Sequence, residues 1–419
     1  MKRIFGLFLL SSLLWLSCSE KPKASLKDNF LESTIGYLAS DSLEGRGTGS
    51  KGERLAGDFV IHEFERIGLT PMGDSSDWRQ SFTYRPHGSL TKHGMGDSSR
   101  LAMSLVQEMV GNNVIGYLDN GQAHTVIIGA HYDHLGYGDE NSLHSGEKAI
   151  HNGADDNASG VAALLTLAKR LKGKYTSNNY LFMAFSGEEK GLWGSNYFCE
   201  NPTIDLDSVT YMLNMDMVGR LNDDSKLAVY GVGTSPSWME ILPGIQVDSI
   251  SITTTESGVG PSDHTSFYME DIPVLHFFTG QHEDYHKPSD DVDKINFEGL
   301  GSVIDYVESV VALCDDKGML EFVRTKDAKE ETPNFKVTLG VMPDYMYSDM
   351  GMRIDGVNAE RPAENAGLLK GDIVIRMGDH EVTDMYTYME GLGMFAPEET
   401  TDVVVLRDGV EVMVPVTWD

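Results

Sequence analysis

The chain has 419 residues, of which 41% are hydrophobic and 23% are charged, and its formal net charge is −31. This length leaves room for two domains, or for one large domain with an appendage, and the composition excludes a globally disordered chain. The 64 acidic residues against 33 Lys and Arg argue against nucleic acid as a partner and against an electrostatic hold on an anionic membrane, because both need clustered positive charge.

Residues 1–17 have the pattern of a signal peptide. Two basic residues precede an apolar run at 4–16, which is too short to span a bilayer. The small residue followed by Cys18 resembles a bacterial lipoprotein signal, although Trp15 stands where that pattern usually has Leu. The resemblance implies cleavage before Cys18, a lipid on that cysteine, and a chain anchored in the bacterial cell envelope, in the periplasm or at the outer membrane. Plain secretion and an uncleaved anchor are the alternatives.

Residues 18–27 form a short polar tether, and the first folded domain is expected to cover 28–314. Apolar residues recur at helical spacing over 53–67, which predicts a helix there. The segment 43–50 before this helix is rich in glycine. A phosphate-binding loop would follow a strand, and none is predicted here, so we expect a loop that leads into the helix.

The middle of the chain alternates apolar runs with helical stretches. Buried strands are predicted at residues 126–130, 180–185, 209–213 and 273–278, and helices at 159–171 and 297–313. Strands that alternate with helices at this interval predict an α/β domain, in which a mostly parallel (mixed) sheet is covered by helices on both faces.

The last part of the chain has a different texture. Residues 315–332 are charged and are expected to be a linker, and residues 333–419 are expected to form a second domain. Short β-like runs are predicted at 336–341, 351–357, 372–377, 401–406 and 410–416, with a short helix near 362–366. This pattern predicts a small β-rich domain.

Acidic and imidazole side chains collect at the downstream ends of the predicted strands of the first domain. They are His131, Asp133, Asp155, Asp156, Glu188, Glu189, Asp216 and His286. Ligands of parallel α/β sheets bind outside the carboxyl ends of the strands, so these groups are expected in one pocket, where their charges would repel. A divalent metal removes that conflict. Ligands of the His, Asp and Glu type without Cys favour zinc, with manganese or cobalt as substitutes.

The number of ligands predicts how many ions the pocket holds. One catalytic zinc keeps three protein ligands and an open position, so two imidazoles and three carboxylates are too many for one ion. They fit two zinc ions that share one carboxylate and a water. Scattered surface acids are the alternative for any single residue, but a poor explanation of the whole set.

Five segments of the first domain carry a family resemblance. They are HYDH at 131–134, GADDNASG at 153–160, SGEEKGL at 186–192, NMDM at 214–217 and YHKPSD at 285–290. In this order they resemble the motifs of the co-catalytic dizinc aminopeptidases, a family that also includes glutamate carboxypeptidase II and glutaminyl cyclases. The resemblance covers about residues 28–313.

The resemblance implies a role for each metal ligand. His131 and Asp216 would hold one zinc, Glu189 and His286 the other, and Asp156 would bridge the two. Asp156 is selected over its neighbour because the bridging residue of the family stands directly before Asn-Ala-Ser-Gly. The peptide bond that follows Asp156 would be cis.

The remaining site residues are also implied by the resemblance. Glu188 would be the general base, and Tyr285 would donate a hydrogen bond to the developing oxyanion. Asp133 would orient His131 through the second ring nitrogen. Asp263 and His264 match a segment that lines the substrate pocket of the family.

The second domain resembles a bacterial-type PDZ domain. The matching segments are LGV at 339–341, PAENAGL at 362–368 and KGDIV at 370–374. The first of them would be the carboxylate-binding loop, beside which a peptide binds as an extra strand. Pro343 and Asp344 depart from the pattern, because Pro343 has no N–H and Asp344 repels a carboxylate. A peptide or protein ligand and a purely structural appendage therefore both stay open.

These features together predict a zinc-dependent metallo-aminopeptidase that releases N-terminal residues from peptides, through a metal-bridging water with Glu188 as general base. Carboxypeptidase or glutaminyl cyclase chemistry on the same scaffold is one alternative, and an inactive scaffold with a peptide-binding PDZ-like module is another. Cyclases lose part of the dinuclear set, whereas His131 and Asp216 are both present here. Membrane contact is expected only through the lipid on Cys18.

Overall fold

The computed structural model describes residues 29–84, 109–138, 141–144, 146–247, 250–325, 337–344, 347, 349–357, 361–383 and 385–418. The predicted signal peptide, Cys18 and the tether lie outside the described residues, and so do residues 326–332 of the predicted linker. Among the described helices, none combines the length and the apolar character that crossing a membrane would require.

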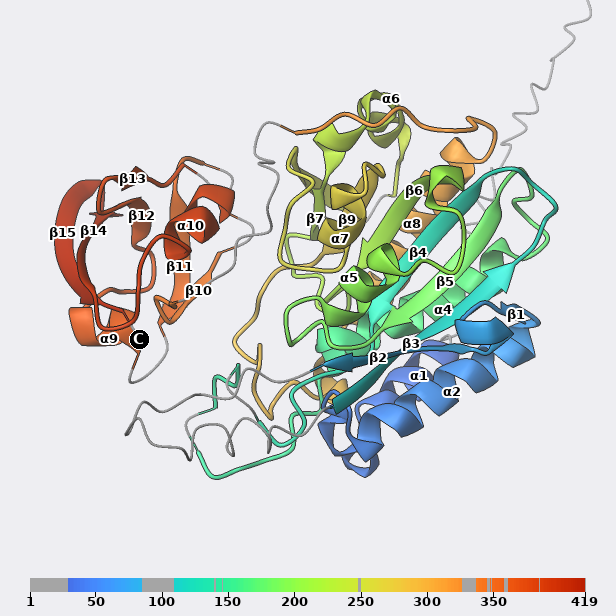
Figure 1. Cartoon of the computed structure of the whole chain (residues 1–419), viewed down its shortest axis with the longest axis horizontal. Coiled ribbons are helices and arrows are strands. Elements are labelled where there is room, and N and C mark those ends of the chain that lie inside the picture. The colour runs from blue at the N-terminus through green and yellow to red at the C-terminus, as the bar shows by residue number, and fades with distance from the viewer. Residues whose placement is uncertain are drawn as a thin grey trace, which may run out of the picture.

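A nine-stranded mixed sheet forms the centre of the first domain, with the order β1-β3-β5-β4-β6-β9-β7-β8 and β2 paired to β3 (Figure 1). The strands are β1 (Thr70–Pro71), β2 (Arg79–Tyr84), β3 (Met109–Leu118), β4 (Thr125–His131), β5 (Asn179–Phe185), β6 (Val209–Met215), β7 (Lys226–Tyr230), β8 (Ser251–Thr255) and β9 (Val274–Phe278). The four central strands, β5, β4, β6 and β9, run parallel. The mostly parallel sheet predicted from the sequence is thereby confirmed.

Helices cover both faces of this sheet (Figure 1). One face packs against α1 (Asn29–Leu38), α2 (Lys51–Ile67), α4 (Gly160–Leu171) and α8 (Phe297–Cys314), and the other packs against α5 (Trp193–Glu200) and α7 (His264–Met269). The short helix α6 (Pro236–Ile241) contributes to the first of these cores. Side chains of β4 alternate between the two cores, with Val126 and Ile128 in the first and Ile127 in the second, because successive residues of a strand point to opposite faces. Both faces are therefore apolar, as parallel strands require.

The second domain has its own antiparallel sheet and its own core. Its strands are β10 (Val341–Pro343), β11 (Met352–Val357), β12 (Ile373–Met377), β13 (His380–Glu381), β14 (Thr400–Arg407) and β15 (Val410–Thr417), with helices α9 (Pro362–Ala366) and α10 (Met385–Leu392). The order is β10-β11-β12-β14-β15, and β13 pairs with β12. The separate core includes Leu339, Val374 and Trp418. The predicted small β-rich domain is thereby confirmed.

The first part of the predicted linker, which follows α8, packs against the first domain. Leu320 is buried in the helix-covered core, although it lies in the predicted linker. Val323 donates its backbone N–H to Thr234 O at 2.8 Å, and Thr325 donates its own to the Tyr268 hydroxyl at 2.9 Å. The chain therefore packs on the first domain through Thr325, because these contacts satisfy its backbone groups.

Candidate metal centre

The five predicted ligand residues converge at one edge of the sheet. His131 ends β4, Glu189 follows β5, Asp216 follows β6, and His286 lies in the loop after β9. Asp156 lies in the turn Ala154–Ser159, directly before α4. The carboxyl ends of adjacent parallel strands meet at one edge, and this brings together residues that are far apart in the sequence.

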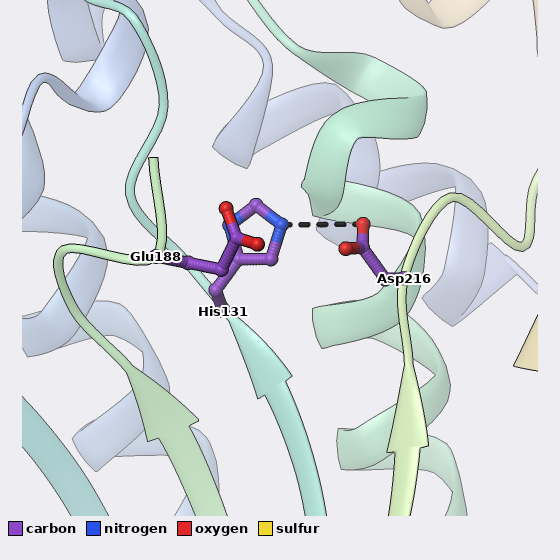
Figure 2. A group of neighbouring side chains, drawn as sticks. All are labelled: His131, Glu188 and Asp216. Carbon is purple, nitrogen blue, oxygen red and sulfur yellow. Dashed lines mark hydrogen bonds and ion pairs between the residues drawn. The ribbon is translucent and has the colours of Figure 1, made fainter. Parts of the chain in front are cut away.

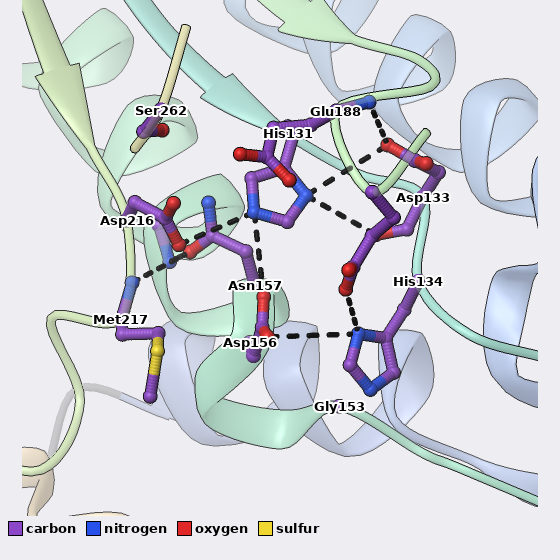
Figure 3. A network of polar contacts seen from close by, with 12 residues as sticks. His131, Asp133, His134, Gly153, Asp156, Asn157, Glu188, Asp216, Met217 and Ser262 are labelled. Carbon is purple, nitrogen blue, oxygen red and sulfur yellow. Dashed lines mark hydrogen bonds and ion pairs between the residues drawn. The ribbon is translucent and has the colours of Figure 1, made fainter. Parts of the chain in front are cut away.

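The side chains form two groups that share Asp156. Figure 2 shows His131 and Asp216 of the first group, and Figure 3 shows Asp156 beside His131. In the first group, His131 Nε2 lies 3.2 Å from Asp216 Oδ1 and 3.3 Å from Asp156 Oδ1. In the second, His286 Nε2 lies 3.3 Å from Asp156 Oδ2 and 3.3 Å from Glu189 Oε2. Asp156 therefore presents one carboxylate oxygen to each group, which is the arrangement of a bridging ligand.

These spacings fit zinc. Two ligands of a tetrahedral zinc at about 2.0–2.1 Å lie roughly 3.3 Å from each other, and the nitrogen–oxygen separations are 3.2–3.3 Å. Among the described residues, two sets of three side chains have ligand atoms close enough together to hold a metal ion. They are His131, Glu188 and Asp216, and His134, Asp156 and Glu189. The donors are imidazole nitrogens and carboxylate oxygens, which zinc accepts.

The backbone around Asp156 is fixed on both sides. The peptide bond between Asp156 and Asn157 is cis, as the family resemblance implies. Asp290 Oδ2 accepts hydrogen bonds from the N–H groups of Asp155 and Asp156, both at 3.0 Å. Asn157 Oδ1 accepts from the N–H of Gly160 at 2.9 Å. The carboxylate of Asp156 therefore projects from a turn that several hydrogen bonds hold in place.

Burial and charge shift the pKa values of the site residues in opposite directions. Burial alone would lower the pKa of His131, but the carboxylates of Asp216 and Glu188 raise it well above its usual value. Burial likewise opposes the shift of Glu189, whose pKa falls to about 2 because of His286 and other neighbours. The pKa of Glu188 rises well above normal through burial and through the nearby Asp216, Glu189 and Asp263. Burial and the neighbouring carboxylates therefore favour the protonated form of Glu188.

Asp133 lies beside the second ring nitrogen of His131, the position that the resemblance implies for it. His131 Nδ1 lies 3.2 Å from the backbone oxygen of Asp133 and 3.7 Å from its carboxylate. The carboxylate also accepts from Thr48 Oγ1 at 2.7 Å and from the N–H of Glu188 at 3.2 Å. Asp133 therefore contacts His131 through both its main chain and its side chain, and its side chain also holds the segment that carries Glu188 (Figure 3).

His134 contacts the site but was not predicted from the sequence. Its Nδ1 lies 2.6 Å from Glu189 Oε1, the oxygen that does not face His286, and its side chain is fully buried. A partner of this kind fixes the orientation of a ligating carboxylate. The signal was present in the sequence, since His134 belongs to the same HYDH segment as His131.

An open cavity adjoins both groups of ligands. It is lined by Asp156, Glu188, Asp216, Met217, Tyr230, Pro261, His276, Phe278, Gln281, Tyr285 and His286. The ring of Tyr285 stacks on that of His286 with centroids 3.8 Å apart. Asp263 and His264 are fully buried and are absent from this lining, whereas nearby Pro261 belongs to it.

Comparison with known proteins agrees with the fold and the motifs. Residues 113–311 match Peptidase family M28, and residues 323–417 match the PDZ domain family. A probable leucine aminopeptidase of Arthroderma otae is 30% identical over 172 residues, which are 39% of this chain and 45% of that protein. Aminopeptidase YwaD of Bacillus subtilis is 29% identical over 199 residues, which are 44% of this chain and 40% of that protein.

The chain thus matches less than half the length of these two curated relatives. Among solved structures, a Zn-dependent exopeptidase from Parabacteroides distasonis has a similar fold, with a TM-score of 0.54 and 18% identity. The similarity covers 68% of this chain and 97% of that structure. With its ordered motifs and its two matched regions, the chain is similar to Peptidase family M28 over residues 113–311 and to the PDZ domain family over residues 323–417.

Proposed function

We propose that the first domain is a dizinc aminopeptidase, which removes N-terminal residues from peptides. The single observation that carries this proposal is the position of Asp156, whose two oxygens each lie 3.3 Å from a different histidine nitrogen. His131 and Asp216 would hold one ion, and Glu189 and His286 the other. The relatives whose names state a leucine aminopeptidase or aminopeptidase activity support the reaction.

The catalytic roles follow from the chemistry of the residues around the cavity. Bound zinc would supply a nucleophilic water at neutral pH and would polarise the scissile carbonyl. Glu188 lines the cavity and is half-buried, so it can take a proton from the attacking water and return it to the leaving amine. Tyr285 lines the same cavity, and its hydroxyl would donate to the developing oxyanion.

The cavity lining also indicates the class of N-terminal residue. Met217, Phe278 and Pro261 give it apolar walls, to which Tyr230 adds an aromatic ring. Burial of an apolar side chain contributes about 25 cal/mol per Å², and no Lys or Arg is found among the lining residues of the described chain. Peptides that begin with an apolar residue are therefore the proposed substrates.

A peptide panel tests this function. Peptides that begin with Leu, Lys or Glu, each with a free or an acetylated amino terminus, are incubated with the protein, with and without a chelator. We expect release of Leu from the free peptide, much slower release of Lys and Glu, and loss of all release with the chelator. Cleavage of only the acetylated peptides, or cleavage that the chelator leaves unchanged, would contradict the proposal.

We also propose that the PDZ domain binds a peptide segment and thereby favours long substrates. In the described part of this domain, β10 pairs with β11 alone and leaves its other edge open to an added strand. Asp344 is paired with Arg353 Nε at 2.8 Å, which offsets the negative charge expected to repel a carboxylate.

Deletion of residues 333–419 tests the role of the PDZ domain. We expect kcat/KM to fall for a long peptide and to stay unchanged for a dipeptide, because only the long peptide can reach both domains. An equal loss on both substrates would mean that the domain is structural.

We further propose that the protein acts outside the cytoplasm, anchored through Cys18. Radiolabelled palmitate that is incorporated into the wild type, and not into Cys18→Ser, would support this anchor, whereas equal labelling of both would contradict it.

A further inference from the structure

Arg46 lies inside the first domain, and its guanidinium donates to main-chain carbonyls. The residue is 1% exposed. Its contacts are Nε to Tyr132 O at 2.9 Å, Nη1 to Leu38 O and Asn152 O, both at 2.6 Å, Nη2 to Gly153 O at 3.0 Å, and Nη2 to Asp156 O at 3.5 Å. Arg46 belongs to the glycine-rich segment 43–50, to which neither the fold nor the proposed reaction has so far given a role.

The carbonyls that Arg46 contacts belong to two segments that carry metal ligands. Tyr132 directly follows His131, and the segment 152–156 leads to the bridging Asp156. One planar guanidinium therefore ties two ligand segments together, although they lie more than twenty residues apart in the chain. The fork of donors in Arg is rigid, so it fixes the relative position of these backbones.

Neighbours of Arg46 make further contacts with the same region. His134 donates its N–H to Arg46 O at 3.1 Å, and Thr48 Oγ1 donates to Asp133 Oδ2 at 2.7 Å. Gly45 has φ +70°, and a Cβ there would lie 2.4 Å from Gly136 O and 2.5 Å from His151 O. The glycine is thus required by a close approach of two backbones. The segment 43–50 is consequently packed directly onto the ligand loops.

Arg46 brings a positive charge close to the site without a hydrogen bond to the side chain of a proposed metal ligand. A buried cation usually pairs with a carboxylate, and Asp156, Asp133 and Glu189 are close enough to interact with it electrostatically. Its hydrogen bonds within the described chain go to carbonyls instead. A direct pair with Asp156 would occupy an oxygen that faces a histidine of the site. Arg46 therefore offsets the repulsion among the acids and leaves their oxygens available.

We propose that Arg46 is a positioning residue of the metal centre, which holds the His131 and Asp156 segments at the spacing that two ions require. This inference rests on the proposed function, because it takes the two ligand groups to be metal sites. It predicts that loss of the guanidinium fork weakens metal binding more than loss of stability alone would explain.

The decisive variant is Arg46→Lys, which keeps the positive charge. A lysine has one nitrogen on a flexible stem, so it cannot reproduce the contacts that Nε, Nη1 and Nη2 of Arg46 make at three separate positions. Zinc affinity is measured by competition with a chelating dye, and the visible spectrum of the Co²⁺-loaded protein reports the ligand geometry. We expect zinc binding about 10–100-fold weaker than in the wild type, as for other residues that hold a ligand in place, together with an altered Co²⁺ spectrum.

Two further variants separate positioning from general stability. Val310→Ala removes buried side-chain atoms from α8, in the helix-covered core, so it should lower the urea midpoint and leave zinc affinity unchanged. Thr48→Val keeps its shape but removes the hydrogen bond to Asp133, and it should weaken zinc binding by a smaller factor than Arg46→Lys. Thr48→Val also carries the test if Arg46→Lys does not fold.

The outcomes are distinct. Wild-type zinc affinity in Arg46→Lys would overturn the role of Arg46, and so would an equal loss of affinity in Val310→Ala. If Arg46→Lys does not fold, wild-type affinity in Thr48→Val would overturn it. Failure of the wild type itself to bind zinc would overturn the proposed function as well. Weaker binding in Arg46→Lys with unchanged binding in Val310→Ala supports the inference.

Discussion

Replacement of Glu188 by Gln is expected to reduce kcat by about 10²–10⁴-fold, the usual contribution of a general base, while both ions stay bound. The amide keeps the size of the side chain but cannot accept the proton. The ligand groups keep their closest contacts, because those join His131 to Asp216 and Asp156, and His286 to Asp156 and Glu189. Metal content by elemental analysis and steady-state kinetics on a Leu peptide measure the two effects.

A matched control shows whether the effect depends on the position of Glu188 or follows from any Glu-to-Gln change. Glu298 is an exposed residue in the first turn of α8, so Glu298→Gln should change neither metal content nor kcat. Activity of Glu188→Gln above about a tenth of the wild type, with both ions present, would contradict the base assignment. Loss of one ion in Glu188→Gln would instead indicate that Glu188 is a ligand, since it also lies within reach of His131 and Asp216.

Replacement of Asp156 by Asn is expected to remove at least one of the two ions and nearly all activity. Each carboxylate oxygen of Asp156 faces a different histidine, and an amide nitrogen cannot replace either of them as a metal ligand. The loss of zinc affinity should exceed the roughly 10–100-fold that follows loss of an outer hydrogen-bond partner. Zinc stoichiometry after dialysis and the rate of Leu release are the measurements.

The adjacent aspartate provides the control for Asp156. Asp155 is fully buried, and it accepts from the N–H of Gly219 at 2.7 Å and lies 3.2 Å from His282 Nε2. Asp155→Asn should therefore lower stability but retain two ions. Two tightly bound ions in Asp156→Asn, or loss of ions only in Asp155→Asn, would contradict the bridging role.

The elements that the sequence predicted well are those with strong apolar patterns. The parallel strands β4, β5, β6 and β9 contain continuous apolar runs, and the helices α4 and α8 repeat apolar residues at helical spacing. The strands without a predicted counterpart carry weaker patterns. β3 contains glycine and asparagine, and β8 is rich in threonine at the edge of the sheet. Their position is decided by pairing with distant strands, which local periodicity does not report.

The predicted ligands were accessible from sequence because each follows a recognisable strand or precedes a recognisable helix. The role of Arg46 could not be predicted from sequence. Its partners are backbone carbonyl groups as many as 110 residues away, and every residue type has such a carbonyl. His134 lies within a quoted motif, but its contact with Glu189 depends on how β4 and β5 end. Asp263 and His264 were assigned to the substrate pocket from the family resemblance, but both are buried and neither lines the cavity. A motif match alone does not reveal such burial.

Zinc titration of the metal-free protein tests the central claim most directly. Zinc is added in known equivalents, and the release of Leu from a peptide with a free amino terminus is followed at each step. The proposed dinuclear centre predicts that activity rises until about two equivalents are bound and that Glu188→Gln binds the same number without activity. A plateau at one equivalent, or activity that needs no metal, would contradict the account.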